Sequence, residues 1–189
     1  MPMIRFDDDR YIARRDVTFL RPRVYLKDTG GTVIAAARAD MTRLRRRITV
    51  YSDIDLTRPI LTITGREIVG FCMRYDVTDT AARTPLGSVC RPGFLSTDRA
   101  RWRLCDTAGR EVARIRMTSA ASLFSSALSR IVPRTWEVVD VSSGRVAAGF
   151  KEKWAAGGIE CDVEFCPEGE GFLDRRCVVA GLMLLLYVR

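Results

Sequence analysis

Apolar and polar residues alternate with a period of two along most of this chain. Residues 159–165 alternate Ile, Cys, Val and Phe with Glu, Asp and Glu, and residues 113–117 alternate Ala, Ile and Met with two arginines. A period of two places successive side chains on opposite faces of a β-strand. The pattern therefore predicts strands with one buried and one solvated face, as in antiparallel sheets.

One phrase occurs twice in the chain. It runs from Trp102 through Asp106 to a Gly-Arg pair and a second apolar run, and again from Trp136 through Asp140 to the same elements. A looser version surrounds Asp28. The aspartate ends a strand, and the glycine supplies the positive φ of a tight reversal. Each copy is a predicted β-hairpin, and repeated hairpins indicate an all-β protein.

The alternation and the turn residues together predict twelve short strands. Twelve antiparallel strands are enough to close a β-barrel and leave no exposed edge. The predicted strands cover residues 16–20, 23–26, 32–36, 47–51, 60–64, 67–77, 86–91, 101–105, 111–117, 135–139, 145–153 and 159–165. Residues 1–15 are mixed and charged, and we expect them to form a flexible arm before a barrel domain at 16–189.

Two segments depart from the β pattern. Residues 120–131 carry apolar side chains at helical spacing and predict a short amphipathic helix that caps one end of the barrel or, as an alternative, touches a membrane. Residues 177–188 are apolar throughout, including Leu182, Leu184 and Leu185. A helix of this length spans about 18 Å, short of the roughly 30 Å hydrocarbon core of a bilayer. A helix that is apolar on every side needs burial on every side, and the barrel interior can provide it.

A train of hairpins followed by an apolar terminal helix resembles the tubby C-terminal-like superfamily, which includes the phospholipid scramblase and LURP-one-related families. The stretches that carry the resemblance are Tyr51-Ser-Asp, Arg74-Tyr-Asp-Val-Thr-Asp, Leu86-Gly-Ser-Val, the Trp102 and Trp136 hairpins, and Leu173-Asp-Arg-Arg with its tail. The overall likeness is to small bacterial-type members. The resemblance implies a twelve-stranded closed antiparallel β-barrel around a hydrophobic C-terminal helix.

The resemblance also limits what is inferred about activity. The chain lacks the Pro-rich arm and the cysteine cluster of animal scramblases, and it has no D-x-D-x-D-G calcium loop. Scramblase activity and calcium dependence are therefore not carried over. Tubby's phosphoinositide site consists of basic residues on the barrel surface, and only that general idea is carried over.

Composition excludes several kinds of chemistry. The chain has no histidine, so Ser-His-Asp and Cys-His catalysis are excluded. Its six cysteines show no C-x-x-C spacing, and we expect no metal site and no cofactor. The N-terminal residues contain no apolar signal core. We expect a cytoplasmic protein with reduced thiols and no transmembrane span.

The charge is strongly basic, and all but three of the 31 basic residues are arginine, with a formal net charge of +8. The densest run consists of Arg43, Arg45, Arg46 and Arg47. Arginine binds phosphate in a bidentate way, so the run is a candidate anion-binding surface, the alternative being a solvated connection between strands. No aromatic residue interleaves with it, and we expect no nucleic-acid partner.

Other conspicuous residues have structural interpretations. Glu160, Asp162 and Glu164 share one strand face and could be carboxylates of an active site, but a turn at 155–158 would place Lys153 opposite Glu160 and Lys151 opposite Asp162 as cross-strand ion pairs. Trp102, Trp136 and Trp154 are predicted to pack inward.

These observations favour a non-enzymatic binding module. We expect its partner to be an anionic phospholipid or phosphoinositide headgroup, or a protein, and its location to be peripheral to the membrane. The alternatives are a scramblase-like membrane-active protein with the terminal run inserted in lipid, and a basic nucleic-acid-associated module.

Overall fold

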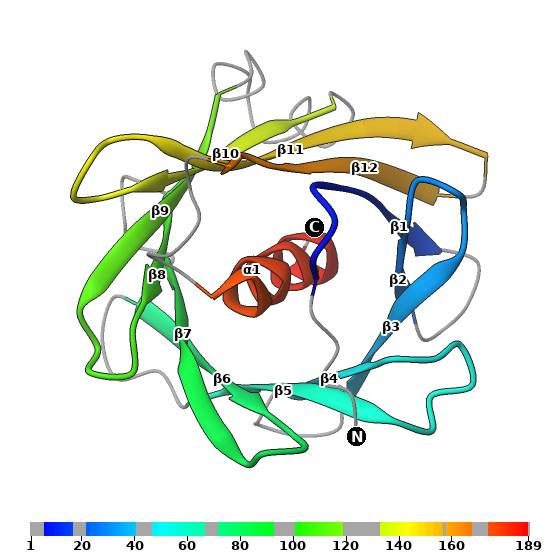
Figure 1. The fold of residues 1–189 in the computed structure, drawn as a ribbon, viewed down its shortest axis with the longest axis horizontal. Helices are drawn as coiled ribbons and strands as arrows, with labels where there is room; N and C mark the ends of the chain where they lie inside the picture. Colours follow the sequence, from blue (N-terminus) through cyan, green and yellow to red (C-terminus); the bar gives the residue numbers. More distant parts are fainter. Residues whose placement is uncertain are drawn as a thin grey trace.

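Within the part of the chain that the computed structural model describes, twelve strands surround one helix (Figure 1). The structure describes residues 6–16, 22–40, 47–66, 72–92, 101–118, 133–156, 158–167 and 174–188. Its elements are β1 (Arg10–Asp16), β2 (Arg23–Lys27), β3 (Val33–Asp40), β4 (Arg47–Tyr51), β5 (Pro59–Gly65), β6 (Cys72–Asp79), β7 (Thr84–Pro92), β8 (Arg101–Cys105), β9 (Glu111–Met117), β10 (Thr135–Asp140), β11 (Val146–Ala155), β12 (Gly158–Phe165) and α1 (Arg175–Val188).

The strands form a closed antiparallel barrel. Each strand pairs with its neighbours in the chain, and β1 pairs with β12 to complete the ring, with Tyr11 opposite Val163. The predicted fold class is therefore confirmed. The predicted bounds of β4, β8 and β9 agree with the structure at both ends.

The predicted flexible arm at 1–15 is wrong for residues 6–15. Residues 10–15 belong to β1, where Tyr11 and Ala13 face the core. Phe6 is buried, and its ring meets that of Tyr11 edge to face at a centroid distance of 6.3 Å. The charged side chains at Arg10 and Arg14 masked the short alternation, because β1 has only two fully buried positions. The predicted strand at 16–20 therefore overlaps β1 only at Asp16, and residues 1–5 and 17–20 lie outside the described residues.

The C-terminal helix α1 lies inside the barrel, as the sequence predicts (Figure 1). Leu182 and Leu184 are buried, and Leu185 is half-buried. The hydroxyl of Tyr187 donates a hydrogen bond of 2.6 Å to the carbonyl oxygen of Ala37 on β3. Gly181 allows a close approach to β9, since a Cβ there would lie 2.8 Å from Cδ1 of Ile115. In the described part of the chain, the helical segments are too short or too polar to cross a bilayer.

Charged residues fix the first turn of α1 to the barrel. Asp174 accepts a hydrogen bond from the backbone N–H of Arg176 at 2.8 Å, as a helix-capping aspartate does. The guanidinium of Arg176 also binds the carboxylates of Asp174 and of Asp79, which is buried at the end of β6. Arg175 donates to the carbonyl oxygens of Phe6, Asp7 and Asp8. The start of the helix is thus tied to both β6 and the N-terminal segment.

Two of the three tryptophans pack as predicted. Trp102 and Trp136 are buried in the core. The prediction for Trp154 is wrong, because its side chain is 56% exposed. Trp154 alternates in step with Phe150 and Glu152, whose side chains are buried, so alternation alone would turn it inward. It is the second-last residue of β11, however, where the strand extends beyond the packed interior. The helix predicted at 120–131 lies outside the described residues.

Aspartates begin the five hairpin turns at the end of the barrel where α1 starts, here called the Asp-turn end. Each accepts a hydrogen bond from a backbone N–H within its turn, which satisfies donors that the strand ladder leaves free. They are Asp28, Asp53, Asp79, Asp106 and Asp140. At Asp140, hydrogen bonds from the hydroxyl groups and backbone of Ser142 and Ser143 lower the pKa of the carboxyl from 3.8 to about 2.

We predict that Leu182→Ala lowers the free energy of unfolding by about 2–5 kcal/mol, the usual cost of truncating a fully buried leucine. Leu185→Ala is the matched control on the same helix, and its half-buried side chain predicts a loss below about 2 kcal/mol. Urea unfolding of both variants measures the difference. Equal losses would contradict the assignment of Leu182 to the centre of the core.

We predict that Asp140 contributes stability that disappears in acid. The pKa of Asp140 is lower in the folded protein, so the native state favours the ionised form, and the contribution is present above pH 4 and is lost as the pH falls toward 2. Thermal unfolding of wild type and Asp140→Asn should differ most at neutral pH and converge near pH 2. A difference that is constant across this range would contradict the prediction.

Candidate functional site

The predicted arginine run lies in the connection between β3 and β4 and at the start of β4. Arg43, Arg45 and Arg46 lie outside the described residues. Arg47 is the first residue of β4, and its side chain is exposed on the outer wall of the barrel. This position is at the end of the barrel opposite the Asp-turn end, because β4 runs from Arg47 toward the turn that contains Asp53.

Two further arginines follow Arg47 around the barrel wall, one on the adjacent strand β3 and one on β2 beyond it. Arg23 of β2 is directly opposite Arg38 of β3, and Asp40, two residues after Arg38, is opposite Arg47 of β4. All three arginine side chains are exposed. We call Arg23, Arg38 and Arg47 the arginine triad. None of the three guanidinium groups forms an ion pair or hydrogen bond with another residue of the described ranges.

The triad differs from the other arginines of the outer wall, many of which have acidic partners. Arg116 binds Glu137 at 2.9 Å, and Arg10 binds Glu164 at 2.7 Å. Like charges that face each other across two strands are destabilising, by roughly 0.2–1 kcal/mol. Asp16 of β1 is opposite Arg23 on its other side and offsets part of the cost of the Arg23–Arg38 pair, and a bound anion would relieve the remainder. This arrangement suits a phosphate or carboxylate group, which arginine binds in a bidentate way.

Trp154 is at the same end of the barrel as the triad. Successive cross-strand partners connect the two. Trp154 is opposite Ile159 of β12, and Ile159 is opposite Arg15 of β1. Arg15 is in turn opposite Val24 of β2, the residue that follows Arg23. An exposed indole combines a large apolar surface with a hydrogen-bond donor, a combination suited to the boundary between water and an apolar phase. This end of the barrel thus presents exposed cations and an exposed tryptophan.

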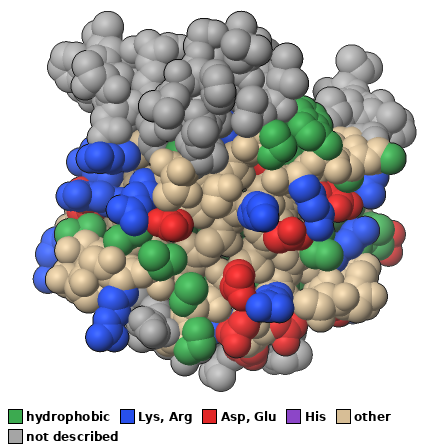
Figure 2. Space-filling model, turned by 90° about the horizontal axis from the view of Figure 1, so that it is seen from above, with side chains coloured by type: hydrophobic (Ala, Val, Ile, Leu, Met, Phe, Trp, Pro, Cys, Tyr) green, Lys and Arg blue, Asp and Glu red, His purple; other side chains and the backbone are tan. Residues whose placement is uncertain are grey.

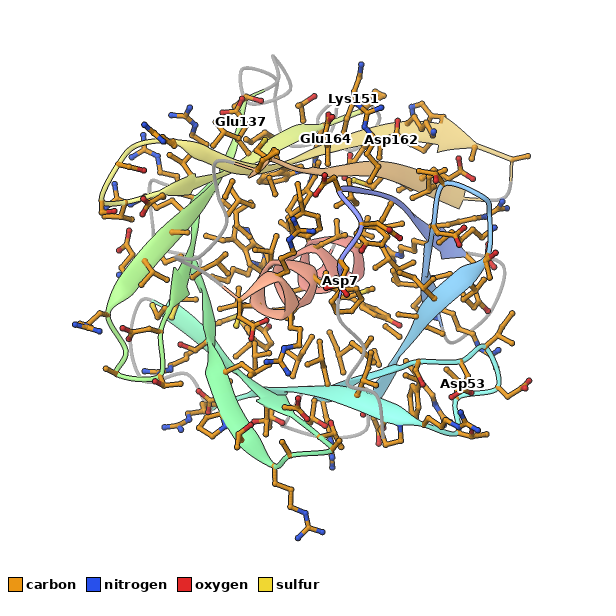
Figure 3. All side chains as sticks on the ribbon, viewed as in Figure 1. Asp7, Asp53, Glu137, Lys151, Asp162 and Glu164 are labelled. Carbon is orange, nitrogen blue, oxygen red and sulfur yellow. The ribbon has the colours of Figure 1, made fainter. Side chains whose placement is uncertain are left out.

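The acidic face of β12 is an array of ion pairs. Lys153 is opposite Glu160 and Lys151 is opposite Asp162, which confirms the predicted register. The ammonium of Lys153 lies 2.7 Å from Asp162 and 3.9 Å from Glu160. In Figure 3 the labelled Lys151, Asp162 and Glu164 side chains lie on the outside of the wall formed by β11 and β12. Figure 2 shows basic and acidic side chains interspersed on this side, in keeping with these ion pairs.

Arg23 and Arg38 were missed as site residues in the sequence, although the signal was present. The residues around Asp28 predict the β2–β3 hairpin. Pairing residues in order away from its turn brings Arg23 close to Arg38 but not directly opposite it. A β-bulge between Leu26 and Lys27 shifts that register by one residue. A one-residue shift exchanges the two faces of a strand, so the sequence alone did not place the two arginines opposite each other.

Comparisons with known proteins support the fold. No protein-family model matches the chain, and no curated protein matches it in sequence. The solved structures include a similar one, the X-ray structure of the Arabidopsis thaliana protein AT5G01750, a LURP-one-related, tubby-like protein. The two chains are 15% identical with a TM-score of 0.52, and the match covers 94% of this chain and 89% of the other. The likeness establishes a shared barrel architecture with a C-terminal helix.

We predict that Arg38→Gln raises the free energy of unfolding by up to about 1 kcal/mol at low ionic strength, because it removes the charge opposite Arg23. The gain should vanish near 1 M salt, where the Debye length is about 3 Å. Arg116→Gln is the matched control, and since it breaks an ion pair with Glu137 it should give no gain. Urea unfolding at two salt concentrations tests both variants, and a loss of stability in Arg38→Gln would contradict the prediction.

Proposed function

We propose that this protein is a non-enzymatic member of the tubby C-terminal-like superfamily that binds anionic phospholipid headgroups at a membrane surface. The observation that carries the proposal is the arginine triad, three exposed guanidinium groups that form no ion pair in the described ranges, although Asp16 and Asp40 are opposite Arg23 and Arg47 on neighbouring strands. The binding surface would combine the triad with Arg43, Arg45 and Arg46 of the adjoining connection, and Trp154 would lie at the headgroup level. The fold likeness and the family motifs support the superfamily assignment.

The proposed binding is peripheral. In the alternative hypothesis, a scramblase-like protein with its C-terminal segment inserted in lipid, α1 would have to leave the barrel. Four of its large side chains are almost fully buried there: Leu182, Met183, Leu184 and Leu186. Each of these large apolar side chains contributes roughly 1.5–3 kcal/mol to the folded state. Extraction of the helix would therefore cost more than a typical domain stability of about 5–15 kcal/mol once cavity costs are added.

The arginines supply electrostatic attraction of moderate strength. A basic residue near an anionic leaflet contributes about 1 kcal/mol, so the triad would contribute about 3 kcal/mol. That corresponds to about a 150-fold change in partitioning. Such binding is reversible and sensitive to salt, since the attraction is screened beyond a Debye length of about 10 Å at 0.1 M.

Vesicle flotation tests the proposal. We expect the wild-type protein to float with phosphatidylcholine vesicles that contain phosphatidylserine at low salt, and to stay in solution at high salt or with phosphatidylcholine alone. The triple variant Arg23→Glu, Arg38→Glu, Arg47→Glu should lose the binding and keep its melting temperature. Replacing Arg43, Arg45, Arg46 and Arg47 by Glu tests the adjoining run in the same assay.

The matched control is Arg58→Glu, Arg83→Glu, Arg145→Glu. It makes the same change of charge with exposed arginines in three turns of the Asp-turn end. We expect this control to bind vesicles nearly as well as the wild type. Equal losses in both triple variants would show that net charge alone drives binding. Failure of the wild type to bind anionic vesicles at low salt would overturn the lipid proposal and favour a protein partner.

A further inference from the structure

Two cysteines lie side by side on the outer wall of the barrel, away from the arginine triad. Cys90 of β7 is opposite Arg103 of β8, and Cys105 of β8 is opposite Ser88 of β7. The two cysteines are thus diagonal neighbours on one face of adjacent antiparallel strands, and Cys90 is the neighbour that lowers the pKa of the Cys105 thiol most. Neither cysteine is in a disulfide, and their exposed fractions are 8% and 7%.

The two strands approach closely at this level. A Cβ added to Gly87 of β7 would lie 2.4 Å from the carbonyl oxygen of Cys105, so only a glycine allows this spacing. Diagonal partners in an antiparallel sheet are normally near the upper limit for a disulfide. A disulfide between Cys90 and Cys105 therefore requires a small movement of β7 toward β8.

Two arginines lie near the pair, and each also has an acidic partner. Arg103 lies beside Cys90 on β8 and contacts Glu111 of β9 at 4.0 Å. Arg74 of β6 is opposite Cys90, and its Nη1 atom lies 3.8 Å from where a Cβ of Gly109 would be, in the β8–β9 turn. The Nε atom of Arg74 also lies 3.3 Å from a carboxylate oxygen of Asp76, which is opposite Ser88. Arginines near a thiol favour its thiolate, the form that reacts.

The charged groups near Cys105 favour ionisation on balance. The hydrogen bond from Cys90 lowers the pKa of the Cys105 thiol to about 7, burial opposes this shift, Arg103 and Arg74 add to it, and Glu111 opposes it. The core cysteines behave in the opposite way, since burial raises the pKa of Cys177 to about 12 and raises the pKa of Cys161 further. Cys105 is thus the most acidic of these three thiols.

An unpartnered hydroxyl completes the site. Ser88 lies on the same face as both cysteines and directly opposite Cys105, and its exposed fraction is 1%. Its Oγ atom has no hydrogen-bond partner in the described structure. A buried hydroxyl without a partner costs roughly 1–3 kcal/mol. An anionic sulfur or a sulfenic oxygen on Cys105 would provide the missing acceptor.

We propose that Cys90 and Cys105 form a reversible thiol–disulfide pair that responds to hydroperoxides. The Cys105 thiolate attacks one oxygen of the hydroperoxide, the O–O bond breaks, and an alcohol or water leaves after gaining a proton. Cys105 becomes a sulfenic acid. The Cys90 thiol then attacks the Cys105 sulfur, water leaves, and a disulfide forms. Two exchange steps with an external dithiol restore both thiols and oxidise the dithiol.

The wild-type protein provides the first test. Native protein is treated with one equivalent of hydrogen peroxide, alkylated, digested with trypsin and analysed by mass spectrometry. We expect the tryptic peptide Leu104–Arg110 to be linked by a disulfide to the peptide that contains Cys90, and the link to disappear after dithiothreitol treatment. No link, or a sulfenic acid on Cys105 that never forms the disulfide, would overturn the proposal.

Variants separate the roles of the two thiols. Cys90→Ser should accumulate a sulfenic acid at Cys105 that dimedone traps, and Cys105→Ser should show neither dimedone adduct nor disulfide. Cys161→Ser is the matched control, because Cys161 is buried in the interior, and it should oxidise like the wild type. Circular dichroism confirms that each variant is folded before labelling. Dimedone labelling of Cys90 in place of Cys105 would overturn the assignment of the nucleophile.

The pH dependence of alkylation tests whether neighbouring groups lower the pKa of the Cys105 thiol. Relative to a thiol with a pKa of 9, Cys105 has about 50 times more thiolate at pH 7, and its lower intrinsic nucleophilicity reduces the advantage to roughly sixfold. We expect the alkylation rate of Cys105 to rise with a midpoint near pH 7, and Arg103→Gln to move the midpoint upward. Arg145→Gln, in a distant turn, should not move it. A wild-type midpoint near pH 9 would overturn the proposal.

Discussion

Burial of a helix that is apolar from Cys177 onward is the constraint on which the rest of this structure depends. An α-helix with its side chains is about 10–12 Å wide, and water on any side of α1 would leave large aliphatic side chains solvated. A sheet can cover one face of such a helix, and only a closed sheet covers every face. Twelve strands provide a ring wide enough for the helix and the inward side chains between them. The short, small residues of β3, Ala35, Ala37 and Ala39, lie on the inner face, and the backbone of this strand accepts the hydrogen bond from Tyr187.

The sequence predicted this architecture well because two simple signals agreed. Alternation located the strands, and uniform apolarity located the central helix. The prediction from sequence failed where the alternating pattern was short, and where burial depended on how far along a strand a residue lies. In β1, the charged residues obscured two buried positions, and at Trp154 the inward parity was correct but the strand had already left the core. Half-buried Leu185 shows the same limit, since an apolar run does not reveal which of its members meets the barrel wall most closely.

The surface features needed information that a single sequence does not contain. The arginine triad and the Cys90–Cys105 pair both bring together residues from different strands, and both depend on register. A bulge shifts the register in the hairpin that carries Arg23 and Arg38. Cys90 and Cys105 are neighbours only because the register of β7 with β8 makes them diagonal partners. The density of Arg43, Arg45, Arg46 and Arg47 was visible because these four residues lie within five positions of the sequence. Features built across strands become visible once the barrel is known.

The pairing of β1 with β12 has a consequence for how the chain folds. Tyr11 meets Val163 across this seam, so the ring closes through contacts between residues from opposite ends of the chain. Closing so long a loop is entropically costly, and folds rich in such distant contacts form slowly. Until the seam forms, β1 and β12 are open edges with unpaired backbone groups, which other chains can join. The native ring has no such edge, so the chain is most exposed to aggregation while it folds.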